Sequence, residues 1–335
     1  MPIHIKNGTT ERTDSQVGFG TLSHFDFSSH MGEGQQILAY ALVLTRFDLY
    51  VENPYSLQGP SVDISRLAVS LVPNLVGNSI YVTANGILNG SAEEVMEPTN
   101  DSSDDSHITY SVIAYIDSPY SSSNTVALKQ AYGLPNGSTS STIYGTPGDM
   151  IASFISGFTT GYSSDKSIKG LRLVASYTTP QDQTTTLTAK AALVHDDDES
   201  PLGQLDMGLI ALGNADALGT VLVDLDDLDW DSPDGKHGMS CTVKKTVTTP
   251  KGFTTLDDAV VLMQNIHLVY GSGGGKDRAI QQVDVGTKSI SWTQNGNSYE
   301  ITLELRLNIW EHSNGHHNYV NKDSNLTAQL LVQFK

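Results

Sequence analysis

The sequence predicts an all-β protein made of three tandem antiparallel β-sandwich domains that arose by internal duplication. Three observations predict this fold class: strictly alternating apolar strands, a composition typical of sheets, and an internal repeat. The chain has 335 residues, which suits two or three domains of about 100–150 residues each. Charged residues make up 17% of it and hydrophobic residues 38%. This balance is typical of sheets with polar outer faces, because each strand needs only alternate positions to be apolar.

Apolar and polar side chains alternate along six segments, and this period of two residues predicts strands with one face in a core. The stretch 257–263 is too short and too β-branched to predict a helix. The six alternating segments are 62–72, 79–88, 170–176, 184–194, 279–291 and 298–310.

An internal repeat relates the first and last parts of the chain. Residues 77–83, GNSIYVT, align with residues 296–302, GNSYEIT, and Leu88-Asn89 then align with Leu307-Asn308 in the same register. A fainter middle copy follows the same order of strands. Each unit is expected to open with a short strand (20–22, 124–126, 219–221) and to close with another (108–116, 205–212, 326–334). The expected units are 17–118, 119–213 and 214–335, after an N-terminal extension at 1–16.

The third unit carries the most specific pattern. An acidic loop with a tryptophan precedes the apolar strand VVLMQNIHL at 260–268, Arg278 leads into the next strand, and NIWEH closes a later strand at 308–312. This order resembles the H-type lectin domain of snail agglutinins and of the C-terminal part of discoidins. The resemblance implies a six-stranded sandwich that binds carbohydrate and assembles as a trimer. Three copies in one chain would reproduce that trimer internally, with pseudo-threefold symmetry.

Sugar binding needs an apolar face against the ring and fixed polar groups that hold its hydroxyls. By resemblance to the family, Trp310 of the third unit would stack on the sugar, and the first unit is the one expected to have lost its site. The plainer alternatives are that Trp310 caps the core and that Arg278 is a solvated loop residue. The residues expected to hold hydroxyls are Asp234, Arg278 and His312 in the third unit, with Arg172, His195 and Asp197 as their counterparts in the second.

The acidic loop before the third unit's first long strand is a candidate for a weak Ca²⁺ site at Asp229, Asp231 and Asp234. Carboxylates grouped on a turn suit Ca²⁺, although the spacing is not that of an EF-hand. A solvated acidic loop is the plainer interpretation. The histidines at 312, 316 and 317 set no geometry for Zn²⁺, and no other cofactor is expected.

Charge and missing motifs narrow the functional classes. The net charge of −18 disfavours binding to nucleic acids, whose backbone is also negative. No segment is apolar enough to span a membrane, and no signal peptide is recognisable, so synthesis in the cytoplasm is expected. A particle-associated or extracellular destination is left open. The single cysteine allows no internal disulfide, and no motif of a hydrolase, P-loop or metalloprotease is present.

The sequence therefore predicts a non-enzymatic, multivalent carbohydrate-binding protein. The alternatives are a structural or assembly protein, such as a virion capsid, tail-fibre or surface-layer subunit, and a toxin or adhesin subunit. The expected partners are glycans, or other structural subunits that include further copies of this chain.

Overall fold

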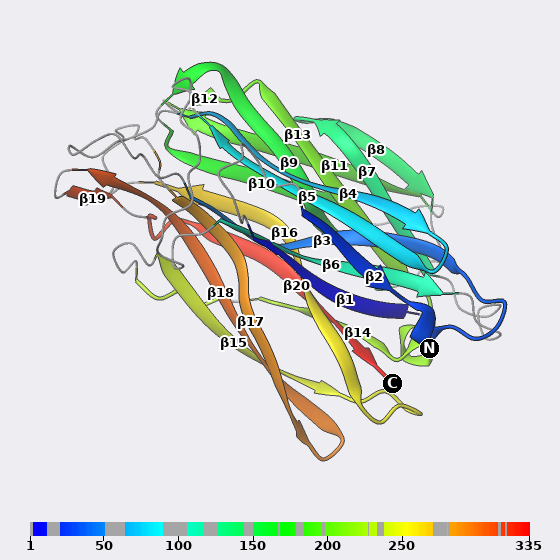
Figure 1. Cartoon of the computed structure of the whole chain (residues 1–335). Coiled ribbons are helices and arrows are strands. Elements are labelled where there is room, and N and C mark those ends of the chain that lie inside the picture. The colour runs from blue at the N-terminus through cyan, green and yellow to red at the C-terminus, as the bar shows by residue number, and fades with distance from the viewer. Residues whose placement is uncertain are drawn as a thin grey trace.

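The computed structural model describes the chain except residues 1–2, 12–20, 51–63, 90–105, 117–125, 144–149, 167, 179–183, 196–197, 227, 233–237, 271–279, 281, 314–315 and 319. The described part is all-β, as predicted, and its strands form three antiparallel sheets (Figure 1). Its 3₁₀ turns include η1 (Ser28–His30) and η3 (Ala215–Leu218).

The three sheets, called A, B and C here, have a main path of six strands each. Sheet A has the order β1 (Ile3–Glu11), β6 (His107–Ile116), β3 (Ile37–Tyr50), β17 (Gln282–Asn295), β18 (Ser298–Ser313) and β15 (Met239–Thr248), and β19 (His316–Asn318) also pairs with β18. Sheet B has the order β2 (Thr21–Asp26), β5 (Ser79–Asn89), β4 (Ile64–Val76), β9 (Met150–Lys166), β13 (Leu202–Leu212) and β7 (Val126–Pro135). Sheet C has the order β12 (Asp198–Glu199), β11 (Thr184–His195), β10 (Gly170–Tyr177), β16 (Leu256–Val269), β20 (Asn325–Phe334) and β14 (Thr220–Asp224), and β8 (Thr139–Ile143) also pairs with β11.

Each sheet is shared between two of the units that the sequence predicts. Sheet A joins β1, β6 and β3 of the N-terminal part to β17, β18 and β15 of the C-terminal part. Sheet B joins β4 to β9, and sheet C joins β10 to β16. Backbone hydrogen bonds therefore run across the expected unit boundaries, so each unit contributes to two sheets. The boundaries themselves and the threefold arrangement stay predictions.

Residues 3–11, expected to belong to an extension, form β1. This strand pairs with β6, as β7 pairs with β13 and β14 with β20. β2, which the sequence predicts as the opening strand of the first unit, pairs with β5 instead. β1 therefore takes the place in the first unit that β7 takes in the second and β14 in the third.

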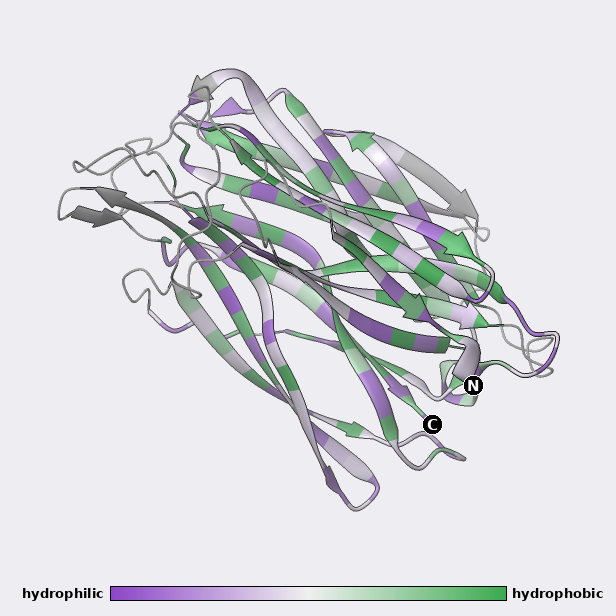
Figure 2. Ribbon diagram, viewed as in Figure 1, coloured by the Kyte–Doolittle hydropathy of each residue, from purple (hydrophilic) through white to green (hydrophobic). Residues whose placement is uncertain are grey.

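In the described residues, each of the six segments with strict alternation coincides with a strand, and the expected absence of a helix at 257–263 is confirmed because these residues belong to β16. Alternation is visible as successive green and purple bands along the strands (Figure 2). β15 lies in a stretch rich in Ser, Thr and Lys that was not predicted as a strand. Its Cys241 and Val247 are buried while Thr242 and Lys244 face outward. The strand therefore has a buried and an exposed face, although its residues are mostly polar.

Two clusters of buried side chains form the core. The larger one contains most of the apolar residues of all three sheets. The smaller one also draws on every sheet, so the three sheets pack around shared apolar contacts. Its members include Ile3, Val43 and Ile113 from sheet A, Phe154 and Ile210 from sheet B, and Leu262 and Leu331 from sheet C.

Candidate functional site

A fork between two strands of sheet A positions the candidate site. β3 and β17 pair from Tyr50 opposite Gln282 as far as Arg46 opposite Gly286. Beyond that point β3 continues beside β6 and β17 beside β18. Each strand has an irregularity at the fork, between Leu44 and Arg46 in β3 and between Thr287 and Ser289 in β17. Such bulges bend strands and re-aim side chains, and they are frequent beside functional sites.

A pocket of about 260 Å³ lies at this fork and is called the fork pocket here. It is bounded by β3 and β17 of sheet A, by β6 and β1 beside them, and by the start of β16 from sheet C. Its lining residues are Asn7, Thr45, Thr109, Ser111, Asp258, Ala259, Val260, Thr287, Lys288, Ser289, Ile290 and Trp292. The N-terminal and C-terminal parts of the chain thus build the pocket together.

Half of the lining residues are polar but uncharged, and Ala259, Val260, Ile290 and Trp292 add apolar surface. Hydroxyl groups come from three threonines and two serines, and an amide comes from Asn7. Trp292 keeps 38% of its surface exposed, so its indole is available to a ligand. An aromatic side chain next to several hydroxyls and an amide offers both apolar contact and hydrogen bonds.

Hydrogen bonds hold the Asp258 carboxylate in a fixed position near the start of β16. Asn7 Nδ2 donates to Asp258 Oδ1 at 3.1 Å and Oδ2 at 3.2 Å, and the backbone N–H of Ala259 donates to Asp258 Oδ1 at 2.8 Å. Ser111 Oγ in turn donates to Asn7 Oδ1 at 2.5 Å. Burial raises the pKa of the Asp258 carboxyl, against the lowering effect of these donors. The series of hydrogen bonds from Ser111 to Asn7 to Asp258 therefore connects β6 and β1 to β16.

Thr287 presents a hydroxyl that the protein itself does not satisfy. The residue is only 8% exposed, and its Oγ1 has no hydrogen-bond partner among the described residues. A buried hydroxyl without a partner costs free energy in the folded state. In a pocket lining, such a group is a candidate contact for a ligand.

Gly286 stands where the two strands part. Its φ is +131°, and a Cβ at this position would lie 2.2 Å from the carbonyl oxygen of Thr45. Only glycine adopts this backbone conformation without strain and leaves room for the close approach of β3. The sequence therefore determines the fork locally through one glycine.

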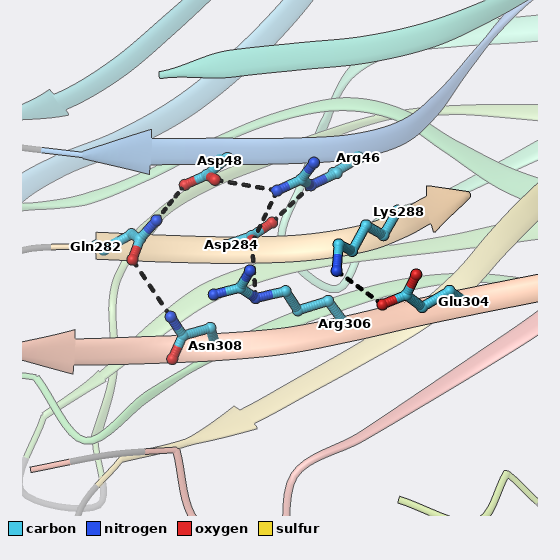
Figure 3. A network of polar contacts seen from close by, with 8 residues as sticks. All are labelled: Arg46, Asp48, Gln282, Asp284, Lys288, Glu304, Arg306 and Asn308. Carbon is cyan, nitrogen blue, oxygen red and sulfur yellow. Dashed lines mark hydrogen bonds and ion pairs between the residues drawn. The ribbon is translucent and has the colours of Figure 1, made fainter. Parts of the chain in front are cut away.

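A network of charged side chains stabilises the closed end of the fork (Figure 3). Asp284 of β17 is fully buried, and Arg46 and Arg306 reach it from the neighbouring strands β3 and β18. Arg46 Nε lies 2.9 Å from Asp284 Oδ1, and Arg306 Nε lies 3.0 Å from Asp284 Oδ2. Arg46 Nη2 also donates to Asp48 Oδ2 at 3.1 Å. These ion pairs connect three adjacent strands of sheet A.

Asp48 is the most perturbed acid of this network. It lies directly opposite Asp284 in the strand pairing and accepts a hydrogen bond from Gln282 Nε2 at 2.7 Å. Burial and the Asp284 carboxylate raise the pKa of Asp48 to about 7, although Gln282 and Arg46 act in the opposite direction. Asn308 Nδ2 donates to Gln282 Oε1 at 3.3 Å and extends the network to β18.

Lys288 of the pocket lining forms an ion pair of its own with Glu304 beside this network (Figure 3). Its Nζ lies 2.8 Å from Glu304 Oε1, and this hydrogen bond lowers the pKa of Glu304. The positive charge of Lys288 is therefore compensated within the protein. Asp258 is left as the charged group of the pocket lining without an opposite charge beside it in the described contacts.

No family model, curated protein or solved structure matches this chain. The resemblance to H-type lectins therefore rests on the residues of the repeats and stays a prediction. Within the described residues, no helix has the length and apolar character needed to cross a membrane.

The residues predicted to bind sugar in the second unit lie on sheet C, outside the fork pocket. Arg172 of β10 and Lys190 of β11 both contact Glu199, at 3.1 and 2.6 Å. These contacts lower the pKa of Glu199. His195 ends β11, and its ring centroid lies 6.0 Å from that of Tyr162. Arg172 is thus engaged in an ion pair on the surface, and Asp197 lies outside the described residues.

The residues predicted in the third unit are only partly described. Trp310 and His312 lie on β18, and Trp310 is opposite Gln282 of the buried network. Asp234 and Arg278 lie outside the described residues. Whether these side chains form a site stays a prediction.

The proposed Ca²⁺ site is also only partly described. Asp231 Oδ2 accepts a hydrogen bond from Ser240 Oγ at 2.9 Å, and its backbone N–H donates to the carbonyl of Ser240 at 2.8 Å. Asp229 belongs to the same loop. In the part of the chain that the structure describes, no three His, Cys, Asp or Glu side chains are grouped so as to hold a metal ion. With Asp234 outside that part, Ca²⁺ binding stays a prediction.

Sequence reasoning missed Asn7, Asp258 and Trp292. Each lies on a strand but outside the six segments with strict alternation, and a polar or aromatic side chain on a strand is usually only part of a solvated face. Two signals were available: an acid at the head of an otherwise apolar strand, and a tryptophan on the polar end of a hairpin. Neither signal shows that Asn7 and Asp258, 251 positions apart, lie in contact.

Proposed function

We propose that this protein is a non-enzymatic carbohydrate-binding protein and that the fork pocket is a binding site. The observation that carries the proposal is the half-exposed Trp292 beside the hydroxyl, amide and carboxylate groups of the pocket. Sugar rings present an apolar face and several hydroxyls, and sites that bind them combine an aromatic side chain with fixed polar groups. Asn7 and Asp258 are fixed in this way by their hydrogen bonds.

The single carboxylate of the pocket favours binding over hydrolysis. Glycoside hydrolases generally use two carboxyl groups on opposite sides of the bond that is cleaved. Among the described residues that line the pocket, Asp258 is the one acid. It would accept hydrogen bonds from sugar hydroxyls.

Multivalency is part of the proposal. The second and third units would supply further sites at Arg172, His195, Trp310 and their neighbours. Several weak sites on one molecule convert low affinity for one sugar into useful avidity for a glycan surface.

Replacement of Trp292 by alanine tests the proposal. Loss of an aromatic contact typically costs about 1 kcal/mol, so roughly fivefold weaker binding to glycans is expected. The measurement is binding to a glycan array, followed by titration of the best ligand against wild type and Trp292→Ala. Tyr132→Ala is the matched control, because Tyr132 is an aromatic residue with 52% of its surface exposed outside the pocket.

Two results would contradict the proposal. If wild-type protein binds no glycan, with or without Ca²⁺, the proposal of carbohydrate binding is wrong. Equal losses in Trp292→Ala and Tyr132→Ala would remove the fork pocket as the site.

A structural or assembly role is the second candidate, and exposed apolar side chains on sheet B favour it. Leu22 of β2 and Val72 of β4 flank Thr83 in one cross-strand row and are 63% and 56% exposed. Val76, near the end of β4, is 55% exposed. Apolar side chains grouped on an outer sheet face are typical of surfaces that contact another protein. Uniform particles in negative-stain images, together with no glycan binding, would place this role first.

A further inference from the structure

We infer that the fork pocket is selective for a neutral sugar ring, and that Thr287 contributes the hydroxyl that a bound ring would satisfy. This inference rests on the proposed function and specifies the class of ligand. It follows from the charges of the pocket and from one unpartnered buried hydroxyl.

The charges of the pocket exclude an anionic sugar. Asp258 lines the pocket as a carboxylate without an opposite charge beside it in the described contacts, and the whole chain carries a net charge of −18. Lys288 also lines the pocket, but Glu304 compensates its charge at 2.8 Å. An acidic or sulfated sugar would bring a second negative charge next to Asp258, with no free cation to balance it in the described lining.

A cationic sugar is disfavoured for a different reason. Both oxygens of Asp258 already accept hydrogen bonds from Asn7, and Oδ1 also accepts one from the backbone of Ala259. Lys288, paired with Glu304, is the other charged residue of the lining. The rest of the polar lining is hydroxyls and one amide, which can both donate to and accept from the hydroxyls of a neutral sugar.

Thr287 is the lining residue that favours a ligand site over a gap in the packing. Its Oγ1 is buried and has no partner in the described part of the protein. No hydrogen bond therefore offsets the free-energy cost of desolvating this hydroxyl. A sugar hydroxyl in the pocket would supply the missing hydrogen bond. Thr287 is therefore a specificity-determining residue of this site.

Replacement of Thr287 by valine separates the two roles, because valine keeps the shape of threonine and removes the hydroxyl. The expected result is a melting temperature equal to or above that of wild type, with affinity for neutral glycans reduced roughly tenfold. The measurements are thermal unfolding and titration calorimetry with the best glycan from the array. Thr293→Val is the matched control, because Thr293 lies on the same strand, is exposed, and does not line the pocket.

The array also tests the charge argument with three sets of glycans: neutral, acidic or sulfated, and amino sugars. Binding confined to neutral glycans, and weakened in Thr287→Val but not in Thr293→Val, supports the inference. Preference for acidic or amino sugars would overturn the inference while carbohydrate binding stands. Unchanged affinity in Thr287→Val would overturn the role of Thr287. No binding to any glycan would overturn the proposed function itself.

Discussion

At the scale of single residues, Asp48 and Asp284 are the most consequential pair. Two carboxylates lie opposite each other on paired strands, and Arg46 and Arg306 contact them. Asp284 has ion-pair partners on both neighbouring strands, whereas Asp48 has Arg46 on its own strand. Burial and the neighbouring Asp284 raise the pKa of Asp48, so the fold favours its protonated form.

This pair predicts a loss of stability as the pH rises. The pKa of Asp48 is raised to about 7 in the fold, above its ordinary value of 3.8. Its contribution to stability is thus fully present below pH 4 and is lost as the pH rises towards 7. Asp48→Asn keeps the acceptor for Gln282 and removes the charge, so we expect it to be more stable than wild type at pH 8, by on the order of 2–3 kcal/mol. Urea unfolding at pH 4.5, 6 and 8 measures the difference.

Glu304→Gln serves as the control for that measurement, since the shift has the opposite sign. The hydrogen bond from Lys288 lowers the pKa of Glu304, so the native Glu304 stabilises the fold above pH 4.5 and loses this contribution as the pH falls. The variant should therefore be slightly less stable than wild type at pH 8. If Asp48→Asn shows the same pH dependence as wild type, Asp48 is ionised in the fold and the prediction is wrong.

At the scale of elements, the fork between β3 and β17 depends on Gly286. Its positive φ and its contact with Thr45 leave no room for a side chain. Gly286→Ala should therefore destabilise the protein by roughly 3 kcal/mol, through backbone strain and overpacking. Chemical unfolding measures the change.

Gly296→Ala is the matched control for Gly286→Ala. Gly296 also has a positive φ, +60°, but lies in the turn between β17 and β18 with nothing within 4 Å of an added Cβ. This variant should cost about 1 kcal/mol, the strain of a left-handed residue alone. Equal effects of the two substitutions would show that β3 does not approach Gly286 closely.

The elements also show how far a sequence can predict this fold. Leu171, Leu173 and Ala175 place an apolar side chain at every second position, so β10 could be predicted from its own residues. β15 could not, because Lys244 and Lys245 obscure the alternation of Cys241, Val243 and Val247. The partner of β3 could not be predicted either, because the contact of Arg46 with Asp284 spans 238 positions and leaves no local pattern. The candidate pocket depends on such contacts, which is why Asn7 and Asp258 were missed.

At the scale of the whole molecule, shared sheets make the parts of the chain depend on one another. If the third unit unfolded, β3 would lose its partner β17 in sheet A and β10 would lose its partner β16 in sheet C. The smaller core cluster also contains side chains from every sheet, so its packing joins all three sheets.

We therefore expect one cooperative unfolding transition for the entire chain. Differential scanning calorimetry measures it: the calorimetric enthalpy should equal the van't Hoff enthalpy. Gly286→Ala should lower the melting temperature of the whole transition without splitting it. Two or three separate transitions would show that the units unfold as independent domains, and the prediction would be wrong.

The pairing of β3 with β17 also has a consequence for synthesis on the ribosome. β3 is complete after residue 50, but β17 begins only at residue 282. At a typical elongation rate, β3 emerges on the order of tens of seconds before β17. During that interval the nascent chain carries an apolar strand with a free edge, which is a template for aggregation. Production of this protein in cells should therefore depend on chaperones that bind the growing chain.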